Sequence, residues 1–407
     1  MESSLGWVYF SRRAFKRAEA LLAESGQGVL DEMGFLAVHS AYANRFFPGT
    51  SVLHTRLRYV LFIPWIYEDL SILGVERGQL ARELEKREML LTGRLEAGTV
   101  KGDSWGIIGV DNYQRKKPAA QPASQIYWGA LGHWRVLRAQ IGGQPPSRTM
   151  LHRSWRPRER RAPLDDDKTP LSEEAFPFTQ LPPRPPHWEN ASSPLDFRIL
   201  SKERQFLRNH LLSVTRRDGQ PSFLSRLVER GPVVQPGLSL YDDSVLAAAD
   251  RDDREALERA RRAAALAAVG RGVYAALVEQ VRENDGDTPT PRRHRENLSK
   301  VLARHGPEGS SLDVEAMRED ADFPEDILEV LRELRRWVVQ APNRPEELAT
   351  LFEKVEYLRK KDRARLSRTL MGRARRSEWD PESHPGAEPL HYRWHIVRNL
   401  LSDLGQD

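Results

Sequence analysis

A proline-rich segment restricts the fold of this 407-residue chain more than any other feature of its sequence. Residues 145–194 hold 11 of the 27 prolines. Because proline lacks a backbone N–H and its ring clashes with the preceding turn, such a segment cannot continue a helix or a central strand. We therefore predict that residues 143–195 form an extended basic and acidic linker between an N-terminal domain, 1–142, and a C-terminal domain, 196–407.

Helical periodicity dominates both predicted domains. Leu80, Leu84, Leu91 and Leu95 form the apolar stripe of a predicted helix over residues 77–95. Further helices are predicted over residues 201–212, 244–283, 323–339, 345–376 and 390–404. The alternation of apolar and polar residues that is typical of strands is nearly absent. We expect a mainly α protein of two helical lobes joined by the linker, with little β structure.

The segment over residues 46–70, FFPGTSVLHTRLRYVLFIPWIYEDL, joins a cationic turn to the densest apolar run of the chain. We predict a central helix over residues 51–70. Residues 60–66 are apolar on every side of that helix, so they are expected to be buried all round, and Pro64 is expected to kink the helix or end it.

The predicted start of this helix is a candidate phosphate or ligand site. A helix N-terminus presents unpaired N–H groups and a partial positive charge, and arginine suits bidentate contact with phosphate. The alternative is structural, with a threonine cap and arginines paired to acids such as Glu32 or Glu68. The candidate residues are Thr50, Ser51, Arg56 and Arg58.

The formal net charge is +5, but the cations are concentrated in two blocks. Residues 111–163 hold eleven Arg and Lys against two acids, and residues 354–376 hold ten against two. In the first block, tyrosines and tryptophans stand between the cations, a pattern typical of proteins that bind single strands. The candidate nucleic-acid-binding residues are Arg115, Lys116, Lys117, Arg156, Arg158, Arg160, Arg161, Arg359, Lys360, Arg363 and Arg365.

Few other residues indicate chemistry. The chain has no cysteine, so thiolate nucleophiles and disulfides are excluded. Ser104 matches a G-x-S-x-G pattern but follows a charged helix rather than a strand, and His391 and His395 lack a third metal ligand. We predict no catalytic residues, no metal and no cofactor. With no apolar run of about 18 residues and no apolar signal core, we expect a cytoplasmic protein without a membrane partner.

Several short motifs resemble one known family. They are SSLGWVYFS near the start, DEMG, FFPGTSVLHTRLRYVLFIPW, GIIG, PASQIYW and the late YRW. Together they resemble the 6361 family of bacterial domains of unknown function, nearly from end to end. The resemblance implies a cellular context, since members are encoded in phage-defence islands near helicase genes. It implies no reaction and no catalytic residues.

These observations lead to one leading hypothesis and two alternatives. We expect a non-enzymatic nucleic-acid-binding or adaptor subunit of a bacterial anti-phage defence system, acting on DNA or RNA with a helicase or nuclease encoded nearby. A protein–protein scaffold would instead use the basic blocks to dock an acidic partner. An unfamiliar enzyme would bind a phosphorylated ligand near residues 49–58.

Overall fold

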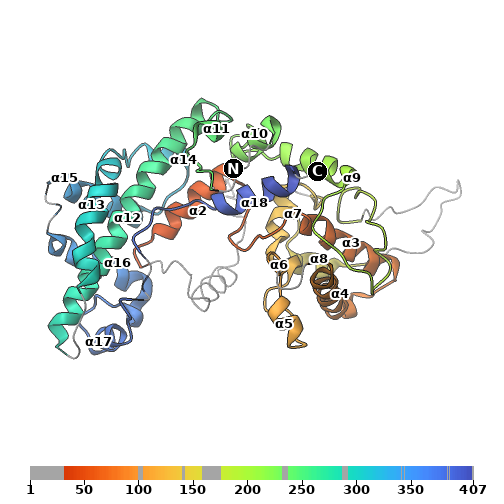
Figure 1. Cartoon of the computed structure of the whole chain (residues 1–407), viewed down its shortest axis with the longest axis horizontal. Coiled ribbons are helices and arrows are strands. Elements are labelled where there is room, and N and C mark those ends of the chain that lie inside the picture. The colour runs from red at the N-terminus through yellow and green to blue at the C-terminus, as the bar shows by residue number, and fades with distance from the viewer. Residues whose placement is uncertain are drawn as a thin grey trace, which may run out of the picture. The chain divides into compact units, whose positions relative to one another are not determined.

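The computed structural model describes residues 32–99, 104–139, 143–157, 176–231, 237–286, 292–340, 342, 344–382, 384 and 386–405. In this part of the chain every regular element is a helix, which confirms the mainly α prediction (Figure 1). Extended pairing among the same residues is limited to two isolated bridges, Leu137 with Phe178 and Thr215 with Pro221.

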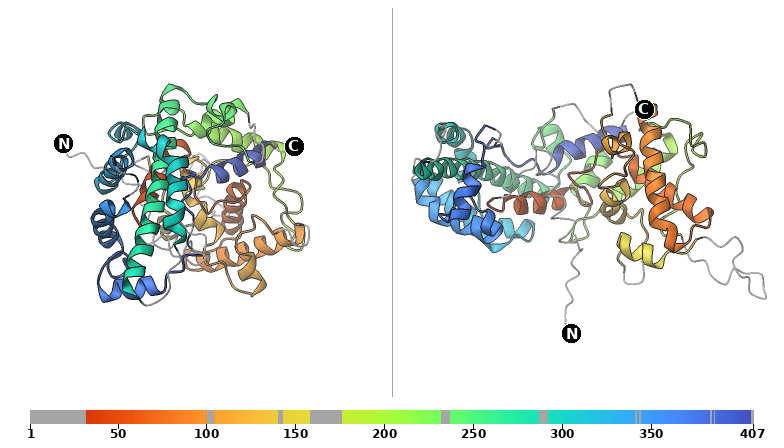
Figure 2. Two further views of the ribbon diagram at one scale, coloured as in Figure 1. Left: turned by 60° about the vertical axis from the view of Figure 1, so that its left-hand side comes forward. Right: turned by 90° about the horizontal axis from the view of Figure 1, so that it is seen from below.

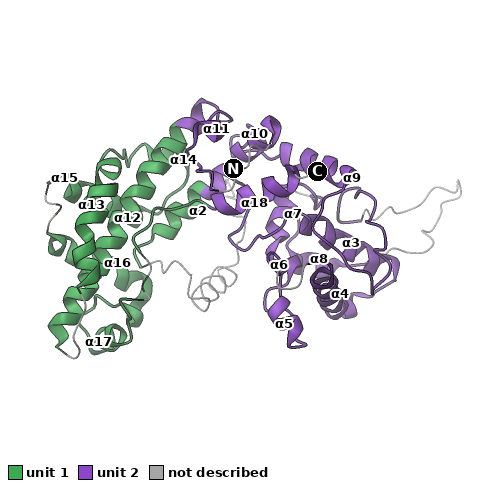
Figure 3. Ribbon diagram, viewed as in Figure 1, with its two compact units in different colours: residues 1–42, 255–392 green, residues 43–254, 393–407 purple. Residues whose placement is uncertain are grey.

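The chain divides into two compact units, and each is built from two separate stretches (Figure 3). Unit 1 comprises residues 1–42 and 255–392, and unit 2 comprises residues 43–254 and 393–407. The divisions therefore fall elsewhere than in the proline-rich segment. The last residues of the chain return to unit 2, which also contains the cationic turn before the central helix.

Unit 2 contains mostly short helices together with two longer ones. They are α3 (Tyr59–Ile72), α4 (Arg77–Gly98), α5 (Val110–Gln114), α6 (Ala123–Ile126), α7 (Trp128–His133), α8 (Arg148–Ser154), α9 (Ser201–Leu212), α10 (Phe223–Arg230), α11 (Asp243–Leu246) and α18 (Trp394–Gly405).

The core of unit 2 is centred on α3. Every residue from 57 to 67 is buried, including the large side chains of Phe62 and Trp65. An all-round apolar surface has to be covered on every side, so the prediction of a buried central helix is confirmed. The helix continues through Pro64 to Ile72, so Pro64 does not end it.

The central helix begins at Tyr59 rather than at residue 51, which corrects the predicted start. Backbone groups of the preceding turn find partners outside a helix. The Tyr127 hydroxyl accepts from the amides of Thr55 and Arg56 at 2.9 and 3.1 Å, and an Asp403 carboxylate oxygen accepts from the Leu57 amide at 2.8 Å. Because these N–H groups are satisfied by distant side chains, the turn has no need of helical hydrogen bonds.

The described residues of the proline-rich segment pack into unit 2. Arg94 of α4 is buried and donates to the carbonyl oxygens of His187, Trp188 and Ser193 at 2.8–2.9 Å. The Trp65 indole donates to the Pro182 carbonyl at 3.2 Å. Prolines keep the segment out of regular helices, yet its carbonyl groups still accept hydrogen bonds, so its described residues cover α3 and α4 instead of crossing open solvent as a linker.

Unit 1 is arranged around the long helix α12. Its elements are α12 (Arg251–Asp285), α13 (Arg293–Ser310), α14 (Met317–Asp320), α15 (Glu325–Gln340), η1 (Pro345–Leu348), α16 (Ala349–Lys360), η2 (Lys361–Arg363) and α17 (Leu370–Ser377), and it shares α2 (Phe35–Phe46) with unit 2. Figures 1 and 2 show α12 and α13 side by side.

Small residues allow close contact along α12. A Cβ atom at Gly309 of α13 would lie 3.0 Å from the Leu266 backbone, and one at Gly270 would lie 2.4 Å from the Phe35 ring. By length and composition alone α12 could cross a membrane, but 83% of its most apolar window is buried inside the protein. This burial is typical of a core helix.

The predicted long basic helix over residues 345–376 is broken into four elements, which corrects that prediction. Lys361 has a φ of 51° and ends α16. The buried Glu356 carboxylate then accepts from the Leu366 amide at 2.8 Å, and the Arg376 guanidinium donates to the Ser367 carbonyl at 2.6 Å. These side-chain contacts hold the backbone of the break, so the chain turns instead of continuing as one helix.

Candidate functional site

The turn before α3 holds the first predicted site, and both of its arginines have carboxylate partners. Arg56 makes a bidentate contact with Asp403 of α18, with Nε 3.1 Å from Oδ2 and Nη2 2.8 Å from Oδ1. Arg58 is buried and its Nε and Nη2 lie 2.9 and 2.7 Å from the two carboxylate oxygens of Glu203, which is also buried. These are the structural ion pairs that the sequence left open, although with partners other than Glu32 and Glu68.

The hydroxyl groups of the same turn bond to its own backbone. Thr50 is buried, and its Oγ1 donates to the Phe47 carbonyl at 2.7 Å. Ser51 Oγ accepts from the Leu53 amide at 3.3 Å. Burial lowers the pKa of His54 to about 3, so its imidazole is neutral at physiological pH. The turn is therefore a packed junction whose charges are already balanced.

Most candidate cations of the second basic block form ion pairs within unit 1. Arg359 lies 2.6 Å from Asp326, while Lys360 and Arg365 lie 3.1 and 3.2 Å from the buried Glu32. Three of the four candidate cations of this block are thus neutralised by carboxylates. Arg363 is exposed, and within the described residues it has no such partner.

The first basic block is more accessible. Arg115, Lys116 and Lys117 are exposed on the turn after α5, and Arg156 is exposed after α8. Arg158, Arg160 and Arg161 lie outside the described residues.

Three of the five tyrosines and tryptophans of the first block are core residues. Tyr127 and Trp134 are at most 1% exposed and Trp155 is 5% exposed, so these rings have no face free for stacking on bases. The expectation of a stacking surface is therefore corrected for these three rings, while Tyr113 and Trp128 are half-buried. Aromatic side chains in a cationic stretch also serve to fix that stretch to the core, and here they do.

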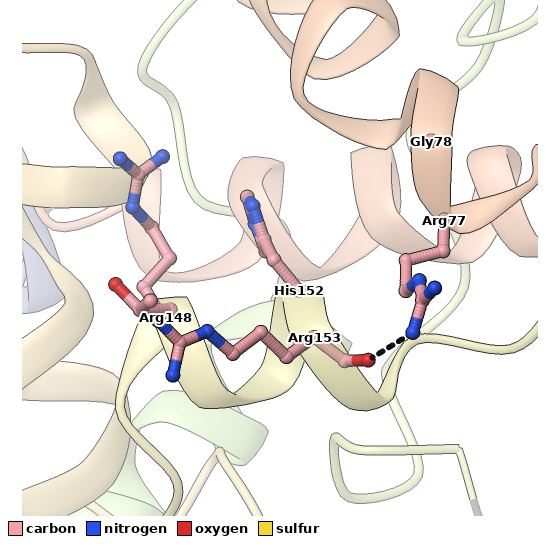
Figure 4. Close-up of a pocket in the computed structure, with 6 residues that line it drawn as sticks. Arg77, Gly78, Arg148, His152 and Arg153 are labelled. Carbon is pink, nitrogen blue, oxygen red and sulfur yellow. Dashed lines mark hydrogen bonds between the residues drawn. The ribbon is translucent and has the colours of Figure 1, made fainter.

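The structure brings together a cationic pocket that the sequence did not indicate. Arg77 and Gly78 of α4 and Arg148, Thr149, His152 and Arg153 of α8 line an open pocket of about 340 Å³ (Figure 4). Arg77 Nη1 donates to the Arg153 carbonyl at 3.3 Å, which ties the start of α4 to the end of α8. No carboxylate stands among the described residues that line this pocket.

Local sequence explains why α8 lies at this place. Ser147 caps the helix by accepting from the Met150 amide at 3.2 Å, and Leu151 is buried beneath it. The Trp155 indole donates to the Val75 carbonyl at 2.9 Å, just before α4 begins. An apolar residue beneath the helix and a tryptophan at its end therefore fix α8 against α4 and hold its arginines at the pocket.

The groups behind the pocket add little negative charge. His152 Nε2 lies 2.7 Å from the Tyr67 hydroxyl, and burial together with the Arg148 charge lowers the pKa of His152 to about 4. Glu88 is 8% exposed, and burial raises its pKa to about 7. Its Oε1 accepts from the Ser124 amide at 2.7 Å, and Ser124 Oγ accepts from Arg148 Nη1 at 3.3 Å. The pocket is therefore a cationic site backed by a neutral imidazole and by a carboxyl group that is partly protonated near neutral pH.

Residues 2–153 of the chain match the model of a family described as "Family of unknown function (DUF6361)". This part of the chain is similar to that family. The DUF6361 match includes α3, α4 and all six residues that line the cationic pocket, but it does not reach the YRW motif, so it is shorter than the motifs implied. Comparisons with curated proteins and with solved structures give no match.

The glycine-containing motif around Ser104 packs against the turn before α3. Thr55 Oγ1 donates to the Gly106 carbonyl at 2.7 Å, and a Cβ atom at Gly106 would lie 2.6 Å from the Arg56 side chain. Gly106, the second glycine of the G-x-S-x-G pattern, therefore permits this close packing. Among the described residues no group of three or more His, Asp or Glu side chains is arranged to hold a metal ion.

Proposed function

We propose that the protein binds the phosphate backbone of DNA or RNA through the cationic pocket of unit 2, as a non-enzymatic subunit of a bacterial anti-phage defence system. The observation that carries the proposal is that Arg77, Arg148 and Arg153 all line one open pocket without a lining carboxylate. Other candidate arginines, such as Arg56, Arg58 and Arg359, are paired with acids.

The chemistry of the pocket favours phosphate over other ligands. Guanidinium groups form paired hydrogen bonds with phosphate oxygens, and they stay charged at all physiological pH values. The neutral His152 adds a polar group without adding repulsion for an anion. The pocket is also open rather than enclosed, which suits a polymer that continues beyond the site.

The proposed contact is to phosphates and not to bases. Phosphate contacts position a nucleic acid but carry no sequence information directly, whereas base contacts need side chains that stack or read base edges. Tyr127, Trp134 and Trp155 are buried and cannot supply stacking. We therefore expect binding that is indifferent to sequence and strongly dependent on salt.

The family context supports the cellular part of the proposal. The resemblance implies relatives that are encoded in defence islands near helicase genes, and on this proposal a subunit that holds nucleic acid would deliver it to a helicase or nuclease. On this proposal the protein works in the cytoplasm, where both kinds of nucleic acid are accessible.

Fluorescence anisotropy with a labelled 20-nucleotide strand in about 50 mM salt tests the proposal. Arg77→Gln/Arg148→Gln/Arg153→Gln should weaken binding at least tenfold, since each charge-assisted hydrogen bond contributes roughly 1.5–3 kcal/mol. Strands of different sequence should bind within about threefold of each other.

A matched control removes three charges from unit 1. Lys354→Gln/Arg363→Gln/Arg368→Gln changes exposed side chains only and should leave the affinity unchanged. Equal losses in both triple variants would show that binding follows net charge and not the pocket. Absence of binding by the wild-type chain at low salt would overturn the proposal, provided that circular dichroism shows it folded.

A further inference from the structure

The corner between α16 and α17 in unit 1 exposes an unusual group of apolar side chains. Tyr357 and Leu358 near the end of α16 are 46% and 54% exposed, and Leu370 and Met371 at the start of α17 are 85% and 50% exposed. Nine large apolar side chains are this exposed among the described residues, and four of them belong to this corner. Single exposed apolar residues are ordinary, whereas a group of them indicates an interaction surface.

The backbone of the corner is held firmly, so the exposure is built into the fold. Thr369 caps α17 by accepting from the Gly372 amide at 3.2 Å. A Cβ atom at Gly372 would lie 2.1 Å from the Ser367 carbonyl oxygen, which shows how closely the first turn of α17 packs on the preceding backbone. The buried Arg376 guanidinium binds Asp285 at 2.7 and 2.9 Å and fixes the other end of α17 to α12.

Exposed cations lie close to these apolar side chains along the chain. The four are Lys354, Lys361, Arg363 and Arg368, and Lys361 Nζ lies 5.6 Å from the centroid of the Tyr357 ring. In the part of the chain that the structure describes, none of the four pairs with a carboxylate, whereas Arg359, Lys360 and Arg365 do. The nearby acids along the chain are the exposed Asp362, the half-buried Glu353 and the buried Glu356, which accepts from the Tyr274 hydroxyl and the Leu366 amide, so the exposed charge of the corner is mainly cationic.

We propose that the α16–α17 corner, defined as Lys354, Tyr357, Leu358, Lys361, Arg363, Arg368, Leu370 and Met371, docks an acidic amphipathic segment of a partner protein. The segment would place leucine- or phenylalanine-like side chains on the apolar residues and carboxylates on the surrounding cations.

Charge and side-chain type favour this occupant over the others. A second copy of the chain would bring like charges together, which opposes association. Nucleic acid would gain nothing from Leu358, Leu370 and Met371, because aliphatic side chains neither stack as aromatic rings do nor bond to phosphate. An acidic amphipathic protein segment satisfies the apolar and the cationic parts together.

The test is selection of a displayed library of random 16-residue peptides on the full-length protein, followed by affinity measurement on the enriched peptides. The proposal expects peptides of net negative charge with apolar residues spaced three or four apart, and it expects Leu370→Asp/Met371→Asp to weaken their binding at least tenfold. Leu370 is the first residue of α17, where an acid is compatible with the helix, so this variant should fold.

Control variants and other occupants complete the test. Val339→Asp, at another exposed apolar position of unit 1, should leave peptide binding unchanged. Arg363→Glu/Arg368→Glu should weaken the binding of acidic peptides, and this loss of affinity relative to the wild type should be larger at lower salt concentration. The proposal is overturned if no peptide is enriched, if the enriched peptides are basic, or if the corner variant binds them as the wild type does. It is also overturned if light scattering shows a dimer that the corner variant abolishes, or if vesicles of anionic lipid bind through the corner in place of peptides.

Discussion

Replacing Arg58 by methionine should destabilise unit 2 severely, because the substitution leaves a buried carboxylate without its partner. Arg58 and Glu203 have side chains that are 3% and 1% exposed, and two hydrogen bonds of 2.9 and 2.7 Å join them. Arg58 Nη1 also donates to the Asp196 carbonyl oxygen at 2.9 Å. Removing one member of a buried pair costs roughly 3–5 kcal/mol, a large part of the stability of an ordinary domain.

The double variant separates the cost of the unpaired charge from the value of the pair. Arg58→Met/Glu203→Met should regain part of the stability that Arg58→Met loses, because two apolar side chains replace the buried ions. Full recovery is not expected, since Glu203 Oε2 also accepts from the Leu200 amide at 3.1 Å at the start of α9. Arg115→Met, at an exposed position, should change stability by less than about 0.5 kcal/mol and serves as the control.

Urea unfolding followed by tryptophan fluorescence is the appropriate assay. Seven of the ten tryptophans, residues 65, 105, 128, 134, 155, 188 and 394, belong to described parts of unit 2, so the signal reports mainly on that unit. A midpoint for Arg58→Met equal to that of Arg115→Met would refute the reasoning. It would mean that Glu203 is protonated or rehydrated at little cost.

Two further variants test the packing of unit 2. Burial raises the pKa of Glu88 from 4.5 to about 7, so the folded state holds its proton more tightly and the wild type loses stability as pH rises from about 4.5 to 7. Glu88→Gln removes this loss. In urea melts, the free energy of unfolding of the variant minus that of the wild type should therefore rise by about 3 kcal/mol between pH 4.5 and pH 8. An unchanged difference would exclude the raised pKa of Glu88. Gly98→Ala should cost about 1–3 kcal/mol, because its Cβ would lie 2.0 Å from the Leu195 carbonyl oxygen. Gly129→Ala meets nothing within 4 Å and should be nearly neutral, and equal melting temperatures for the two would contradict the packing described.

Local pattern was sufficient to predict several helices of this fold, although it missed α13 and the break within residues 345–376. The apolar run before Leu70 became the buried α3, and the leucine stripe over residues 77–95 became α4. In both cases the spacing of apolar residues shows which sides of the helix are buried. This spacing can be read from one or two helical turns of sequence. Helix ends were less predictable, because Tyr127 and Asp403 satisfy the amides before α3 from 71 to 346 residues away.

The organisation of the chain was not predictable from local pattern. Proline content correctly indicates a lack of regular secondary structure over residues 176–195, but it does not say whether that backbone crosses solvent or packs. Here Arg94 donates three hydrogen bonds to it, and a buried arginine on α4 cannot be distinguished by sequence from the exposed arginines around it. The return of the chain end to unit 2 likewise rests on contacts between distant residues.

The candidate site was predicted only in part, for the same reason. Cation density indicated the first block, which includes Arg148 and Arg153, but Arg77 lay in a helix that looked merely amphipathic. Counting charges could not show that Arg56, Arg58, Lys360 and Arg365 have carboxylate partners, because those acids are about 145 to 350 residues distant. The number of cations in a stretch overstates the number that remain for a ligand.

The salt dependence of nucleic-acid binding tests the central claim most directly. Each phosphate that a protein neutralises contributes about 0.7 to the slope of log K against log salt concentration for single strands. We expect Arg77→Gln/Arg148→Gln/Arg153→Gln to make that slope shallower by about 2, while Lys354→Gln/Arg363→Gln/Arg368→Gln leaves it unchanged. Equal slopes for the wild type and the pocket variant, measured between about 25 and 200 mM salt, would show that the pocket neutralises no phosphate and would contradict the proposed function.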